Sequence, residues 1–368
     1  MTARRILAAA LAAALLVPAG AATPAAGAVT TAAGPGALLS AEEFWAPGFE
    51  LARAWRITYR STSATGAANT VSGTVLVPRL PYPGPRPVIG YAVGTHGLGD
   101  QCAPSRRLAS GTEGEAAIIG QYTARGWAVA VTDYEGLGTA GDHTYTAGRS
   151  AGHALLDVVR AAQRLTGSRG PAGVTGYSQG GQAAGWAAQL HASYAPDIDL
   201  RGSVVGAPPA DLEGAARAND GGLGSGLILA AGAGLDAAYP ELGLPGYLNA
   251  AGVSAVADVR GSCVAEFSVR YAFRRLAEFT TVDVLALPEW RVRLAEQRLG
   301  GVTPDAPVLL YHSPADELLP FGFSEKLSRD WRGGELTWWV APAGGHVPTL
   351  VVVNPAAVQW LASAITAG

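Results

Sequence analysis

Ala172-Gly173-Val174-Thr175-Gly176-Tyr177-Ser178-Gln179-Gly180-Gly181 is the stretch of sequence that decides the fold. It starts with a β-rich run, and apolar residues at helical spacing follow over 180–191. Between them, the pattern Gly-x-Ser-x-Gly places a serine at a sharp turn, where flanking glycines let the helix approach the strand closely. The pattern alone is weak evidence in a chain with 49 glycines. Its position between a strand and a helix nevertheless predicts a strained turn that carries Ser178.

Outward from this turn, short apolar runs alternate with longer helical patterns at 115–125, 152–165 and 180–191. Strands separated by helices are typical of an α/β protein with a mostly parallel sheet, buried on both faces. Ahead of them, the β-rich runs 53–59 and 70–77 predict an antiparallel hairpin at the edge of the sheet. The expected parallel strands are 88–93, 128–132, 173–177, 204–205, 308–311 and 336–340.

The alternation breaks between about residues 208 and 301, where the chain is rich in Ala, Gly and Leu. We expect helices there, among them 269–278 and 289–298. The apolar stretch 223–239 fits a lipid-facing helix and an ordinary buried helix equally well. The sequence therefore predicts a core formed by 29–208 and 301–368, with a helical cap inserted at 209–300.

The N-terminus has the three parts of a secretory signal peptide. Arg4 and Arg5 precede an apolar run from Ile6 to Val17, and small residues suited to cleavage follow. The run is too short to span a bilayer, so we expect residues 1–28 to be removed and the protein to be secreted. The formal net charge of −3 and the lack of a basic block argue against a nucleic acid partner.

The chain has two cysteines, Cys102 and Cys263. Secretion would place them in an oxidising compartment, so we expect them to form a disulfide. Closing so long a loop would stabilise the fold by about 4 to 5 kcal/mol on the chain-entropy model. Two separately buried thiols are the alternative. Neither cysteine lies in a CxxC and no HExxH occurs, so we expect no metal.

A serine hydroxyl needs a base to take its proton and an acid to orient that base. Asp316 and His346 follow the strands expected at 308–311 and 336–340, in the order nucleophile, acid, histidine. Competing histidines lie at positions where a structural role is more common, and Glu317 and Asp305 compete for the role of the acid. The competing histidines are His312, His153 and His191.

A tetrahedral intermediate also needs hydrogen-bond donors for its negative charge. We expect one donor to be the backbone N–H of Gln179, the residue after the nucleophile. The second is expected from His96 or Gly97, in the glycine-rich loop 94–100 after an early strand. The alternative is that these glycines only shape the backbone of the loop. The segment Asp133-Tyr134-Glu135 fits either a substrate-lining loop or, more often, a structural one.

Taken together, these motifs resemble the secretory lipase family. The resemblance rests on Gly-Leu-Gly-Asp-Gln-Cys-Ala-Pro-Ser at 97–105, on 133–136, on 176–182 and on the Asp316 and His346 loops. It implies an α/β-hydrolase fold with a helical cap, and hydrolysis of triacylglycerols and simpler esters without a cofactor. Family members from yeasts carry an acidic residue in the loop that supplies the second oxyanion donor, and its counterpart is not evident here.

The leading hypothesis is thus a secreted lipase or esterase that meets lipid ester substrates, with transient contact to a lipid interface, and acts as a monomer. A triad does not choose the leaving group, so a peptidase or acyltransferase on the same fold is an alternative. A non-catalytic binding protein on a hydrolase scaffold is a second alternative. Such proteins usually lack a triad member, whereas this chain has all three.

Overall fold

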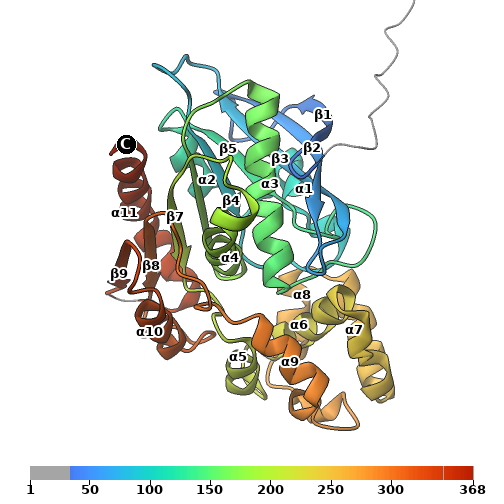
Figure 1. Cartoon of the computed structure of the whole chain (residues 1–368). Helices are drawn as coiled ribbons and strands as arrows, with labels where there is room; N and C mark the ends of the chain where they lie inside the picture. Colours follow the sequence, from blue (N-terminus) through green and yellow to red (C-terminus); the bar gives the residue numbers. More distant parts are fainter. Residues whose placement is uncertain (1–33, 343, 368) are drawn as a thin grey trace, which may run out of the picture. The chain divides into compact units, whose positions relative to one another are not determined.

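The computed structural model describes residues 34–342 and 344–367, so the expected signal peptide at 1–28 lies outside the described residues. Within them, nine strands form one sheet in the order β1-β2-β3-β5-β4-β6-β7-β8-β9 (Figure 1). Neighbouring strands from β5 to β9 in this order pair in parallel. The pairs β1–β2, β2–β3 and β3–β5 are antiparallel. The strands are β1 Leu38–Phe44, β2 Ala52–Thr62, β3 Ala68–Pro78, β4 Val88–Ala92, β5 Ala128–Thr132, β6 Ala172–Tyr177, β7 Leu200–Gly206, β8 Val308–His312 and β9 Leu336–Val340.

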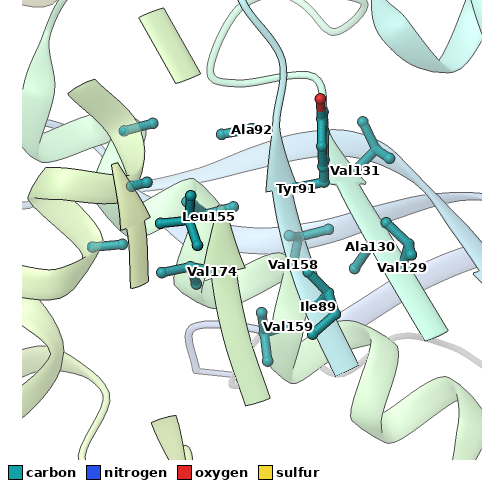
Figure 2. Close-up of a cluster of buried hydrophobic side chains, with 14 of the residues drawn as sticks. Ile89, Tyr91, Ala92, Val129, Ala130, Val131, Leu155, Val158, Val159 and Val174 are labelled. Atoms are coloured by element: carbon teal, nitrogen blue, oxygen red, sulfur yellow. The ribbon is translucent and has the colours of Figure 1, made fainter. Parts of the chain in front are cut away.

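Helices cover both faces of the parallel part of the sheet, which is why every residue of β4, β5, β6 and β8 is buried. Helices α3 (Gly148–Thr166) and α4 (Gln179–Tyr194) contact each other and the sheet, while α2 (Ala116–Thr123) contacts β5 and α11 (His346–Thr366) contacts β7. Figure 2 shows how side chains of α3 such as Leu155 and Val159 meet those of β4 and β6. The remaining core helices are α1 Pro104–Ser110 and α10 Phe321–Asp330.

The predicted hairpin corresponds to β2 and β3, but it does not form the edge of the sheet. Strand β1 pairs antiparallel with β2 and takes the edge position. The sequence of β1 hides its nature, because Glu42 and Glu43 occupy adjacent exposed positions and break the alternation. Their carboxylates form salt bridges with Arg56 and Arg53 of β2. Cross-strand charge pairs, and not apolar burial, mark this strand.

Helix α11 is the one helix in the described residues that is long and apolar enough to cross a membrane, by length and composition only. Leu361 of α11 is fully buried, and its side chain lies where β-carbons on Gly173 and Gly202 of the sheet would clash. A helix that packs on a sheet in this way is a core helix, and that packing explains its buried apolar residues.

Between β7 and β8 the described chain forms helices that gather at one end of the sheet (Figure 1). One of them, α6, has Leu229, Ala230 and Ala233 buried in the hydrophobic core of this helical region, while Leu227 and Ile228 line a pocket. Helix α6 is therefore at least partly an ordinary buried helix, and contact of its other side chains with lipid stays a prediction. The helices are α5 Leu212–Asn219, α6 Ser225–Ala238, α7 Ala250–Gly261, α8 Val264–Tyr271 and α9 Pro288–Glu296, with short 3₁₀ turns between them.

The helix predicted at 269–278 is wrong. Helix α8 ends at Tyr271, and a separate 3₁₀ turn covers Leu276–Glu278. Phe273 between them has φ +63°, and its backbone N–H donates to the Gly222 carbonyl. A contact with a distant segment thus replaces the next helical hydrogen bond, and the local pattern could not predict it.

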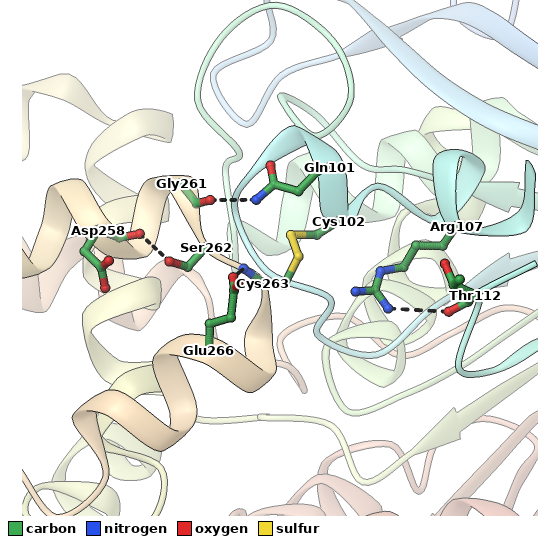
Figure 3. The surroundings of a disulfide bond; sticks show 9 residues. All are labelled: Gln101, Cys102, Arg107, Thr112, Asp258, Gly261, Ser262, Cys263 and Glu266. Carbon is green, nitrogen blue, oxygen red and sulfur yellow. Dashed lines mark hydrogen bonds between the residues drawn. A yellow bond between two sulfur atoms is a disulfide. The ribbon is translucent and has the colours of Figure 1, made fainter. Parts of the chain in front are cut away.

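Cys102 and Cys263 form the predicted disulfide, with Cα atoms 5.5 Å apart and a sequence separation of 161. It joins the loop after β4 to the start of α8 (Figure 3). The same two segments share further contacts: Gln101 Nε2 donates to the Gly261 carbonyl at 2.7 Å, and Gly97 pairs with Cys263 in an isolated β-bridge. The disulfide therefore lies within a larger contact between the loop and the cap.

Candidate active site

Ser178 lies between β6 and α4, in a strained turn with φ +59° and ψ −121°. The two flanking glycines are required by close approach. A β-carbon on Gly180 would lie 1.9 Å from the Ala92 carbonyl oxygen, and one on Gly176 would lie 2.2 Å from the Gly180 carbonyl oxygen. A non-glycine residue with positive φ is uncommon and often marks a functional position. The turn holds the Ser178 hydroxyl at the point where helix and strand meet.

The structure brings Ser178, His346 and Asp316 together in a single chain of hydrogen bonds. His346 Nε2 lies 2.9 Å from Ser178 Oγ, and His346 Nδ1 lies 2.7 Å from Asp316 Oδ2. His346 is the first residue of α11, and Asp316 lies in the loop after β8. Because an ionised carboxylate only accepts hydrogen bonds, His346 carries its proton on Nδ1 and leaves Nε2 able to accept the serine proton.

The side chain of Asp316 is fully buried. Burial favours the neutral acid, but hydrogen bonds from His312 and His346 outweigh it and hold the pKa of Asp316 well below its usual range. Its second oxygen accepts the backbone N–H groups of Leu318 and Leu319, at 2.9 and 2.8 Å. Asp316 is thus an ionised acceptor for the His346 proton at any pH near neutrality.

The competing residues have other partners. Glu317, adjacent to Asp316, accepts the backbone N–H of His346 at 2.8 Å and does not reach its ring. Asp305 pairs with His191 at 2.9 Å. His153 stacks on Tyr194, with the ring centroids 4.0 Å apart, and burial lowers the pKa of His153 to about 4. None of these contacts reaches Ser178, so they are consistent with structural roles for the competing residues.

The loop after β4 places the two candidates for a second oxyanion donor differently. Gly97 has φ +127° and faces the cap, because a β-carbon there would lie 2.5 Å from the Cys263 Cα atom. Both ring nitrogens of His96 are engaged: Nε2 lies 2.8 Å from Glu113 Oε1, and Nδ1 lies 2.9 Å from the Gly94 carbonyl oxygen. The imidazole of His96 therefore has no free donor, so an oxyanion contact from His96 or Gly97 would involve a backbone N–H group.

Two glutamates that the sequence analysis did not single out support this loop. Glu115 accepts the backbone N–H of Gly94 at 2.7 Å and the Tyr91 hydroxyl at 2.5 Å. Burial raises the pKa of the Glu115 carboxyl. Glu113 accepts from His96 and from the Glu115 backbone N–H. No local signal identifies the role of Glu115, because its carboxylate does not cap α2 and instead binds the Gly94 N–H, 21 residues earlier.

His143 is a third residue that sequence reasoning missed. Its Nε2 lies 3.2 Å from Gln179 Nε2, and its Nδ1 lies 2.8 Å from the Glu135 carbonyl oxygen. Burial lowers the pKa of His143 to about 4, so its ring is neutral and can accept from the Gln179 amide. The segment 133–136 therefore acts at this site through the backbone of Glu135, and Asp133 is buried against Ser72 and Ser105.

A pocket with about 990 Å³ of empty space, including its open mouth, reaches the site. Ser178, Gln179 and His346 are among its lining residues. Most of the others are aliphatic side chains of the cap, such as Leu212, Ile228, Leu244, Leu285 and Leu294. Residues 34–342 and 344–367 contain no group of His, Cys, Asp or Glu side chains arranged to hold a metal ion.

A nucleophile elbow on a mostly parallel sheet, with a histidine and a buried carboxylate on later loops, defines the class of α/β-hydrolases. The profile of the secretory lipase family matches residues 103–366. The chain belongs to the secretory lipase family, a family of carboxylic ester hydrolases.

Curated relatives include active and inactive proteins. A probable inactive lipase of Mycobacterium tuberculosis is 30% identical over 84% of this chain and 72% of its own length. A secreted triacylglycerol lipase of Malassezia furfur is 30% identical over 77% of this chain and 61% of its own length. A probable trichothecene esterase of Stachybotrys chartarum is 29% identical over 84% of this chain and 68% of its own. The chain thus spans about three fifths to three quarters of these proteins.

Solved structures confirm the predicted α/β-hydrolase fold. Candida antarctica lipase A in its closed state superimposes with a TM-score of 0.83 at 22% identity, over 90% of this chain and 82% of that one. A rice cell wall degrading esterase from Xanthomonas oryzae gives a TM-score of 0.75 at 20% identity, over 89% of this chain and 97% of that one. At this level of identity the likeness establishes the fold alone.

Proposed function

We propose that the protein is a secreted lipase or esterase in which Ser178 attacks the carbonyl carbon of a carboxylic ester. His346 Nε2 takes the serine proton as the bond forms, and Asp316 stabilises the resulting imidazolium. His346 then gives this proton to the leaving alcohol, and water releases the acid from the acyl-enzyme by the same steps. The observation that carries the proposal is the hydrogen-bonded series Ser178, His346, Asp316 at an apolar pocket.

The negative charge of the tetrahedral intermediate requires donors that already point at it. Gln179 is the first residue of α4, so its backbone N–H has no acceptor within the helix. We assign it as the first oxyanion donor, with a backbone N–H of His96 or Gly97 as the second. The hydrogen bonds of Glu115 and Glu113 to this loop support the second assignment, because they fix its backbone before substrate binds.

The lining of the pocket favours an apolar acyl group. Cap side chains such as Leu212, Ile228 and Leu285 offer almost no hydrogen-bond partners, so a charged or strongly polar substrate would lose its hydration without compensation. A lipid ester has no such cost. The secreted lipases among the relatives agree with this substrate class and with export, for which residues 1–28 would be the signal peptide.

The test compares wild type with Ser178→Ala. It asks first whether the protein is active at all, because one relative is a probable inactive lipase. We expect a fluorophosphonate probe to label wild type and not the variant, and p-nitrophenyl butyrate and triolein to be hydrolysed by wild type alone. Equal labelling of both proteins would support a non-catalytic binding protein. Fast cleavage of aminoacyl anilides together with inert esters would favour a peptidase.

A further inference from the structure

One carboxylate oxygen of Asp316 serves two histidines. Oδ2 lies 2.7 Å from His346 Nδ1 and 2.9 Å from His312 Nε2, while Oδ1 accepts the Leu318 and Leu319 backbone N–H groups. We propose that His312 is a positioning residue for the ester hydrolysis proposed above, on which this role depends. It fixes the orientation of Asp316 and so keeps the His346 ring aligned with Ser178.

The proton positions on His312 follow from its two partners. An ionised carboxylate only accepts, so Nε2 of His312 carries a proton that it donates to Asp316. Nδ1 lies 2.7 Å from the hydroxyl of Ser324 on α10, and this hydroxyl can donate to it. His312 and Ser324 are both fully buried, so water does not compete for these bonds. A neutral ring with its proton on Nε2 therefore satisfies every partner.

This arrangement ties Asp316 to the sheet. His312 is the last residue of β8, and its ring packs edge-on against Phe321, with the ring centroids 5.8 Å apart. Asp316 itself lies in a loop, where its carboxylate could otherwise rotate between alternative hydrogen-bond donors. Without His312, the His346 ring would be the only donor to Oδ2. Oδ2 would then no longer be held in place, and the His346 ring would lose a partner of fixed position. A small misalignment of the base can cost about 10²-fold in rate.

Removing His312 should also raise the proton affinity of Asp316 and shift the pH profile of the reaction. A hydrogen bond to the ionised form of Asp316 lowers its affinity for a proton, so removing the bond makes Asp316 more basic. A more basic partner holds the His346 proton more tightly, and the acid limb of the pH profile moves upward. The other titratable groups at His346 are Glu317 at its backbone N–H and Tyr177, whose hydroxyl donates to its carbonyl; neither changes in the test.

The experiment uses the full secreted protein and three variants: His312→Phe, His312→Gln and Ser324→Ala. We expect His312→Phe to lower kcat about 10- to 100-fold on p-nitrophenyl butyrate with little change in KM, and to move the acid limb up by roughly 0.5 to 1 pH unit. Gln can still donate a hydrogen bond to Asp316, so His312→Gln should recover most of both losses. Ser324→Ala should shift the limb in the same direction by less.

A matched control is His191→Phe, which removes another buried histidine that pairs with an aspartate, Asp305. It should lower thermal stability and leave the pH profile of the folded enzyme unchanged. If His312→Phe retains the wild-type rate and acid limb, or only loses folded protein as His191→Phe does, His312 has no positioning role. If His312→Phe does not fold, a wild-type kcat and an unshifted acid limb in Ser324→Ala overturn the proposal.

Failure of the proposed function would look different. Wild type that neither reacts with a fluorophosphonate nor hydrolyses esters would refute the hydrolase itself. Equal labelling rates for wild type and His312→Phe would instead refute only the role of His312.

Discussion

Two carboxyl groups are held near Ser178 on opposite sides of β6 in the strand order, and their pKa values are displaced in opposite directions. Asp316 follows β8 and its pKa is lowered; Glu115 supports the loop after β4 and its pKa is raised. Both are removed from water, which favours the neutral acid in each case. Asp316 has four donors that include two imidazoles, whereas the side chain of Glu115 accepts from Gly94 and Tyr91. The donor set therefore decides in which direction the pKa of each buried carboxyl is displaced.

The largest expected effect tests this contrast on activity. Asp316→Asn places an amide N–H or a neutral oxygen against Nδ1 of His346. The His346 ring can then carry its proton on Nε2, where it cannot accept the serine proton, so we expect kcat to fall by about 10⁴-fold. Glu115→Gln keeps an acceptor for Gly94 and a polar partner for Tyr91, so the loss should stay below about tenfold. Both are measured as kcat on p-nitrophenyl butyrate. A comparable loss in Glu115→Gln would mean that the charge of Glu115 is required.

The second prediction concerns the loop after β4, which Glu115 supports and which the disulfide joins to the start of α8. Replacing Cys102 and Cys263 together by Ser should lower the free energy of unfolding by about 4 to 5 kcal/mol, because the closed loop constrains the unfolded chain. Urea denaturation measures this change. Gln101→Ala is the control, since it removes one hydrogen bond between the same segments and should cost about 1 kcal/mol. Equal losses in both variants would contradict the loop-closure account.

The third prediction uses the opposite pKa shifts. The folded pKa of Asp316 lies below its unfolded value of about 3.9, so Asp316 contributes stability above that pH and the contribution is lost as pH falls through the folded pKa. Glu115 has a raised pKa, so its ionisation destabilises the fold as pH rises above the unfolded value. Asp316→Asn should thus be less stable than wild type at pH 7. Glu115→Gln should be as stable or more stable, and this difference should shrink near pH 4. The deficit of Asp316→Asn should persist at pH 4 and shrink only as the pH falls further toward the folded pKa of Asp316.

The smallest effect is expected at Glu317, the neighbour of Asp316. Its carboxylate accepts the His346 backbone N–H, and Gln can provide the same acceptor, so Glu317→Gln should change kcat by less than about threefold. Steady-state kinetics beside Asp316→Asn would measure this directly. A loss similar to that of Asp316→Asn would assign the acid to Glu317.

The meeting of Ser178, Asp316 and His346 was predictable because each follows a recognisable strand in the chain order of α/β-hydrolases. Ser178 also needs glycines at fixed positions, and the structure gives each of them a backbone neighbour. The parallel strands were predictable for a similar reason, since burial on both faces leaves continuous apolar runs. What these residues share is a local pattern.

Glu115, His143 and His312 act through contacts that no local pattern encodes. Glu115 binds a backbone N–H that lies 21 residues earlier, and His143 meets Gln179 across 36 residues. His312 was visible as a competitor of His346, but its bond to Asp316 depends on the path of the loop between them. In the cap, Phe273 leaves the helix because it bonds to Gly222. Such features require the packed structure.

The β-bridge between Gly97 and Cys263 limits how the cap can be exchanged between this protein and its relatives. The N–H groups of Leu98 and Val264 donate across it, to the carbonyls of Ser262 and His96. A cap transplanted from another lipase without its own partner loop would leave these groups unpaired in the loop after β4. The exchangeable unit is therefore the cap together with residues 94–103, and grafts cut at the cap boundaries alone should yield folded cores that turn over poorly.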